Sequence, residues 1–133
     1  MSEQPFIQVE AAPTFNRNLR TLAKKYRSIR SDIQPVIEQL ERGDLPGDRI
    51  SGISYEIFKL RVRNSNIQKG KSGGYRLIYY LKTAKGIILL TIYTKSEQGD
   101  ITADELTSII ADYEQHAARE DEDVKNNSST ELL

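Results

Sequence analysis

Nine basic side chains and no acidic one lie between Ile57 and Lys95. They are Lys59, Arg61, Arg63, Lys69, Lys71, Arg76, Lys82, Lys85 and Lys95. Residues 1–56 carry eight basic and eight acidic residues, and residues 96–133 carry two basic residues against eleven acidic ones. The overall net charge of zero therefore hides a +9 block followed by a −9 block. Guanidinium and ammonium groups bind phosphates, so the basic block predicts a polyanion site; the alternative is an ordinary solvated surface.

Alternation along three expected strands gathers these cations on one face. Residues 55–63 alternate, with the apolar side chains Phe58, Leu60 and Val62 opposite the cations. If those three residues pack under helices, the other face of the sheet carries Lys59, Arg61, Arg63, Arg76, Tyr93 and Lys95, with Tyr80 sharing the face of Arg76. We expect Arg76 to point away from the core. Like charges on neighbouring strands destabilise a sheet, and an anionic ligand would explain the cluster. Tyrosine adds a ring that can stack on a base.

The loop at 64–74 adds two further cations. Gly70-Lys71-Ser72 resembles the end of a phosphate-binding P-loop, but Ser65 stands where that motif needs glycine. A strand follows where the P-loop would open a helix, so nucleotide hydrolysis is not expected. The loop can still offer backbone N–H groups, Lys69 and Lys71 to a phosphate. His116 is expected to be an ordinary surface histidine.

Composition excludes several kinds of site. There is no cysteine and one histidine, so disulfides, thiolate catalysis, cysteine zinc sites and multi-imidazole sites are ruled out. The longest aliphatic run, Ile87–Leu90, is far shorter than the roughly 20 residues that span a membrane. No signal peptide is visible in Met1–Glu10. These features indicate one small cytoplasmic domain.

Local signals predict seven elements around these residues. We expect a first strand at 5–11, a helix opening at Pro13, a second helix from Ser28 or Ser31 to Gly43, and a loop at 43–54. Strands follow at 55–63, 75–82 and 87–95, with a tight turn at Lys85-Gly86. Thr102 to Glu105 form a capping box that starts the last helix.

The order β-α-α-β-β-β-α predicts an α+β fold with a small antiparallel sheet. Two N-terminal helices cover one face, a C-terminal helix closes the domain, and the other face is expected to stay open to solvent or ligand. We divide the chain into a domain at 1–118 and an acidic, disordered tail at 119–133.

Several segments resemble the RelE/HigB branch of the RelE/ParE toxin superfamily, over roughly residues 5–115. They are Leu22–Tyr26, Phe58–Arg63, Gly70–Tyr80 and Tyr93–Glu97, of which Gly70-Lys71-Ser72-Gly73-Gly74-Tyr75-Arg76 is the most specific. The resemblance implies a RelE-like fold and a toxin of a bacterial type II toxin–antitoxin pair. It also implies a cognate antitoxin, through which the complex binds its own operator. RelE and HigB members cleave mRNA in the ribosomal A site, whereas ParE members poison DNA gyrase.

The resemblance also assigns roles. Arg76 matches the arginine that contacts the scissile phosphate, Lys59 and Arg61 match a basic pair on the preceding strand, and Lys95 matches a basic position ending the last strand. This chain has Ser96 where RelE has arginine, and Thr102 where RelE has its late catalytic tyrosine. We therefore predict catalytic roles for Lys59, Arg61, Arg76, Tyr93 and Lys95, and RNA binding by Arg63, Lys69, Lys71 and Tyr80.

The acid-free block favours a metal-independent, cofactor-free reaction, because two-metal nucleases need carboxylates at the reacting centre. The RNA 2′-hydroxyl would be the nucleophile, and Arg61, Arg76 and Lys71 would stabilise the pentacovalent phosphate. The general base stays open among Lys59, Lys95, Tyr93, Glu56 and Glu97. A gyrase poison and an inert binding module are the competing functions.

Overall fold

The computed structural model describes residues 6–67, 74–95 and 99–131, with side chains described as far as Arg119. Its elements are β1 (Gln8–Ala11), α1 (Pro13–Lys25), α2 (Ile29–Glu41), β2 (Asp48–Arg49), β3 (Ile57–Val62), β4 (Tyr75–Thr83), β5 (Gly86–Thr94) and α3 (Ala103–Glu131). All seven predicted elements are confirmed in their predicted order. The structure adds β2, a strand of two residues inside the segment expected to be a loop.

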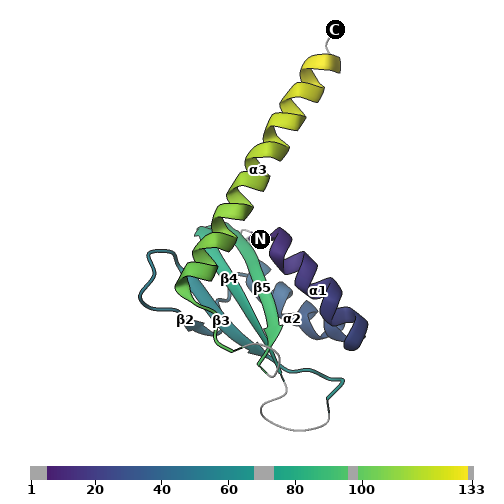
Figure 1. Ribbon diagram of the computed structural model, residues 1–133, viewed down its shortest axis with the longest axis vertical. Helices are drawn as coiled ribbons and strands as arrows, with labels where there is room; N and C mark the ends of the chain where they lie inside the picture. The colour runs from purple at the N-terminus through teal and green to yellow at the C-terminus, as the bar shows by residue number, and fades with distance from the viewer. Residues whose placement is uncertain (1–5, 68–73, 96–98, 132–133) are drawn as a thin grey trace, which may run out of the picture.

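The strands form one sheet in the order β1-β5-β4-β3-β2 (Figure 1). The pairs β3–β4 and β4–β5 are antiparallel, as predicted, and the added strand β2 also pairs antiparallel with β3. The edge strand β1 instead pairs in parallel with β5, with Val9 opposite Ile87. Parallel neighbours need a long crossover between them, and the two helices and three strands between β1 and β5 provide it.

The first hydrophobic core lies between the sheet and the two N-terminal helices. Its buried members include Phe15, Leu22, Ile29, Ile33 and Leu40 from the helices and Tyr75, Leu77, Tyr79, Ile87, Leu89 and Ile92 from the sheet. Phe58 and Leu60 pack against this cluster and Val62 belongs to it, as their alternation in β3 predicts.

A second core fills the opposite face of the sheet, where the sequence was expected to leave an open surface. Leu106, Ile110 and Tyr113 of α3 pack with the sheet residues Ile57, Ile78, Ile88, Leu90 and Tyr93. The expectation of an open face was wrong because these apolar sheet residues need a cover, and the amphipathic first half of α3 supplies it. Figure 1 shows α3 crossing this face of the sheet.

The predicted capping box sets where α3 begins. The N–H of Glu105 donates to Thr102 Oγ1 at 3.1 Å, and the N–H of Thr102 donates to Glu105 Oε1 at 3.4 Å. From there α3 continues as a helix through 119–131, the segment expected to lack regular structure, and extends away from the sheet (Figure 1). The division at residue 118 stays a prediction. Within the described residues, no helix is long and apolar enough to cross a bilayer.

Candidate nucleic-acid interface

Three of the predicted catalytic residues are direct cross-strand neighbours on three adjacent strands. Arg61 of β3 lies opposite Arg76 of β4, and Arg76 lies opposite Tyr93 of β5. We call these three residues the arginine row. It lies next to the sheet end where β3 stops, β4 starts and β5 stops. Arg61 is exposed, whereas the sheet buries the other two members of the row.

Arg76 is only 8% exposed, which corrects the expectation that it points into solvent. It is on the predicted face, but Arg61 and Tyr93 flank it on both neighbouring strands. Its guanidinium donates to the carbonyl oxygen of Tyr75 over a long 3.4 Å, and neither salt bridge found among the described residues includes it. A buried cation beside a second cation destabilises the fold unless an anion compensates it. The burial and charge of Arg76 therefore favour a negatively charged ligand at this position.

Lys59 lies two register positions before Arg61 on β3, opposite Ile78, and is half-buried. Its Nζ atom is 3.6 Å from Oδ1 of Asp100, an exposed carboxylate in the segment before α3. Sequence reasoning missed Asp100, which is far from Lys59 along the chain. The signal that could have found it is that Asp100 lies just before the capping box of a helix whose apolar side must pack on the sheet.

Tyr93 is 5% exposed, and its hydroxyl oxygen is buried. Burial raises the pKa of Tyr93 above its ordinary value, and the negative charge of Asp100 raises it further. The Ile101 backbone and the guanidinium of Arg76 oppose this shift. The phenol is therefore neutral at physiological pH and unsuited to act as a base. Tyr93 lies opposite Arg76 in the β4–β5 register, close enough for the guanidinium charge to act on its hydroxyl.

Arg63 and Lys95 flank the arginine row just beyond the ends of β3 and β5, and both are exposed. Gly74, the last glycine of the motif before β4, has a structural reason to lack a side chain: a Cβ atom there would lie 2.6 Å from the Val62 carbonyl oxygen. The predicted phosphate-binding residues Lys69 and Lys71 lie outside the described residues, as do Ser96 and Glu97.

Other candidates are not brought to this end of the sheet. Tyr80 packs edge-on against Tyr55, with ring centroids 5.4 Å apart, within the core under α3. Glu56 is 3.9 Å from Arg49 and precedes the far end of β3. The hydroxyl of Thr102 is engaged in the capping box, so it is no substitute for a catalytic tyrosine. His116 is exposed on α3, as expected.

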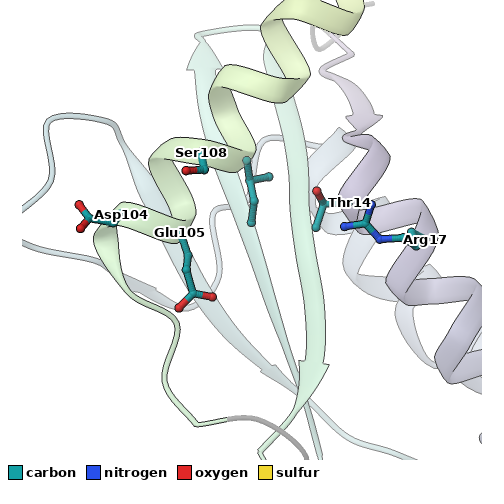
Figure 2. A pocket seen from close by; sticks show the side chains of 6 residues that line it. Thr14, Arg17, Asp104, Glu105 and Ser108 are labelled. Carbon is teal, nitrogen blue, oxygen red and sulfur yellow. The ribbon is translucent and has the colours of Figure 1, made fainter.

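A shallow groove of about 400 Å³ runs between α1 and α3 (Figure 2). It is lined by Thr14, Arg17, Asp104, Glu105, Ser108 and Ile109. Figure 2 shows β5 passing behind the groove, with Thr14 and Arg17 on α1 facing Glu105 and Ser108 on α3. Its mixed charges and open shape offer less for a polyanion than the arginine row. No group of three or more candidate metal ligands occurs among the described residues.

A comparison with protein families agrees with the fold. Residues 14–133 match the family described as the RelE toxin of the RelE / RelB toxin-antitoxin system. The match covers all but the first 13 residues of the 133-residue chain, including the acidic segment in α3.

Proposed function

The protein belongs to the RelE toxin family and is the toxin of a toxin–antitoxin system, and on this premise we propose that it is an endoribonuclease that cuts mRNA in the ribosomal A site. The family implies an antitoxin partner. The ribosome as the place of cleavage, a cytoplasmic location and operator binding through the antitoxin are parts of the proposal.

One observation carries the proposal: two arginines face each other across β3 and β4, and one of them is buried without a carboxylate contact in the described part of the chain. A phosphate entering between Arg61 and Arg76 would accept hydrogen bonds from both guanidinium groups. These bonds strengthen as the scissile phosphate takes on extra negative charge in the transition state. The arrangement therefore favours a phosphoryl-transfer site over a passive basic surface.

The reaction uses the RNA 2′-hydroxyl as nucleophile. Its oxygen forms a bond to phosphorus while the bond from phosphorus to the 5′-oxygen breaks, which leaves a 2′,3′-cyclic phosphate and a 5′-hydroxyl end. The 2′-hydroxyl proton passes to the carboxylate of Asp100, which the ion pair with Lys59 holds beside the arginine row. The ammonium group of Lys95, exposed at the end of β5, protonates the departing 5′-oxygen. Tyr93 positions Arg76.

The test uses purified ribosomes, an mRNA and the protein freed of its antitoxin. The mRNA should be cut, the new ends should be a 2′,3′-cyclic phosphate and a 5′-hydroxyl, and a 2′-deoxy residue at the cut position should stop the reaction. Chelation of metal ions should matter only as far as the ribosome itself needs magnesium. Asp100→Asn should slow cleavage while leaving RNA binding intact.

Two results would overturn this function. Cleavage of the 2′-deoxy substrate would show that the 2′-hydroxyl is not the nucleophile. Intact mRNA together with gyrase-linked DNA breaks in poisoned cells would make the protein a gyrase inhibitor of the ParE kind.

A further inference from the structure

The surface where α1 ends and α2 begins carries a second cluster of cations. Residues 11–31 contain six basic side chains and no acidic one. Four of them, Lys24, Lys25, Arg27 and Arg30, surround the junction of the two helices, and all four are exposed. We call these four residues the α1–α2 corner. Like the acid-free block in the sheet, the α1–α2 corner brings several positive charges close together, and their mutual repulsion opposes folding.

Two contacts attach this corner to the sheet end that carries the arginine row. Tyr26, between the cations, packs edge-on against Tyr75 with ring centroids 5.8 Å apart, and Tyr75 directly precedes Arg76. The N–H of Ser28 donates to Asn66 Oδ1 at 2.9 Å, and Asn66 closely follows Arg63. The corner and the row are therefore neighbouring parts of one end of the molecule.

Helix electrostatics explain only half of the corner. Lys24 and Lys25 lie in the last turn of α1, where cations interact favourably with the helix dipole. Arg30 lies in the first turn of α2, where the dipole disfavours a cation, and Arg27 lies between the two helix ends, where the dipoles of α1 and α2 act in opposite directions. The acid of that turn, Asp32, accepts a hydrogen bond from the N–H of Ser65, and neither salt bridge among the described residues reaches Arg27 or Arg30.

The chemistry of the corner favours nucleic acid over a protein partner. Phe6 and Leu45 are the large apolar side chains that are exposed in the described part of the chain, and neither belongs to the corner. The centre of a protein interface is apolar and depleted in lysine, whereas nucleic-acid interfaces are polar and strongly cationic. Phosphate groups along an RNA backbone supply repeated negative charge that suits such a surface, and above all Arg27 and Arg30.

We propose that the α1–α2 corner binds the backbone of the RNA strand that continues beyond the nucleotide held at the arginine row. The strand leaves the row past Arg63 and reaches Arg27 and Arg30. The inference takes the identity of the ligand from the proposed function, but it concerns binding alone and does not require that the protein cleave RNA.

The experiment measures the affinity of the free protein for single-stranded RNA oligonucleotides with 2′-methoxy groups throughout, which cannot be cut. Single-strand-binding folds engage about 4 to 16 nucleotides, so the two probes have about 4 and about 16 nucleotides. Arg27→Gln/Arg30→Gln is compared with Arg42→Gln/Lys85→Gln, which removes the same charge from exposed positions elsewhere. Melting temperatures confirm that both variants fold.

Arg27→Gln/Arg30→Gln should weaken the long probe roughly 10- to 30-fold at about 0.1 M salt and lower the salt slope by about 1.4, the share of two phosphate contacts on a single strand. It should leave the short probe unchanged. The control should change neither, Arg61→Gln should weaken both, and Arg27→Lys/Arg30→Lys should keep the wild-type slope.

Equal affinity of wild type and Arg27→Gln/Arg30→Gln for the long probe would overturn the proposal. Unchanged RNA affinity with weaker binding of the antitoxin would assign the corner to the antitoxin instead. Length-dependent binding by a protein that leaves mRNA uncut on ribosomes would refute the proposed function but support the corner. Cleavage of mRNA by a protein whose RNA affinity does not depend on Arg27 and Arg30 would support the proposed function and refute the role of the corner.

Discussion

Replacing Arg76 by methionine should make the protein more stable and inactive at once. Arg76 is 8% exposed and lies directly opposite Arg61. Removing a directly opposed like charge recovers about 0.2–1 kcal/mol. The hydrogen bond to the Tyr75 carbonyl is 3.4 Å long and contributes little. Methionine fills a similar volume, and even buried ion pairs can be replaced by apolar side chains with a neutral or stabilising effect of roughly 1–4 kcal/mol, so replacing a buried cation that lacks a carboxylate partner should not cost stability.

We therefore expect Arg76→Met to raise the free energy of unfolding by about 1 kcal/mol. For a chain of this size, that change raises the melting temperature by roughly 4 °C. Loss of one donor to the transition-state phosphate should lower the cleavage rate about 10²- to 10³-fold. Circular dichroism during heating measures the first quantity, and cleavage of mRNA on purified ribosomes measures the second.

Arg61→Met is the matched control because Arg61 belongs to the same pair but is exposed. It removes the same like-charge contact without filling a buried site, so its stabilisation should be smaller while its activity loss is similar. A fall in melting temperature for Arg76→Met would show that the guanidinium holds the sheet together. The interpretation of Arg76 as a cation kept for an anionic ligand would then be wrong.

Other predictions test the scaffold. Leu77→Ala should cost about 2–5 kcal/mol of unfolding free energy in urea titrations, because Leu77 is fully buried. Thr102→Ala should cost about 0.5–2 kcal/mol by removing the cap of α3, with loss of activity if Asp100 then shifts. Burial raises the pKa of the Tyr79 hydroxyl in the folded protein. As pH rises above about 10, the tyrosine of the unfolded chain loses its proton first, so the free energy of unfolding should fall. Tyr79→Phe should make this fall smaller, as melting temperatures measured across that pH range would show. Deleting 119–133 should raise RNA affinity at low salt if the acidic segment repels RNA, and no change would make it a bystander.

The elements were predictable because their signals are local. Alternation placed Phe58, Leu60 and Val62 under the helices, and the structure puts all three in or against the first core. The capping box at Thr102 and Pro13 at the start of α1 likewise act within one helical turn. Alternation also placed Arg61, Arg76 and Tyr93 on one face of the sheet, and the structure adds that they stand opposite one another in register.

The features that sequence reasoning missed depend on contacts between distant segments. No local pattern places α3 across the second face of the sheet, because the amphipathicity of a helix does not say which surface covers its apolar side. The parallel pairing of β1 and the two-residue strand β2 depend on neighbours far along the chain. Packing between distant segments has further consequences of this kind. It buries Arg76 and the hydroxyl of Tyr93, and it brings Asp100 close to Lys59.

The position of α3 links the scaffold to the chemistry. Its capping box fixes the start of the helix at Thr102, and its buried face fixes the helix over the sheet. The residues just before the cap are thereby held against the cationic end: Ile101 beside Tyr93 and Asp100 beside Lys59. The helix that covers the second core thus also positions Asp100, whose carboxylate is the one that contacts a predicted catalytic cation among the described residues. A substitution that shifts the start of α3 should therefore displace Asp100, the proton acceptor of the proposed reaction. It should lower the cleavage rate while phosphate binding by Arg61 and Arg76 is still intact.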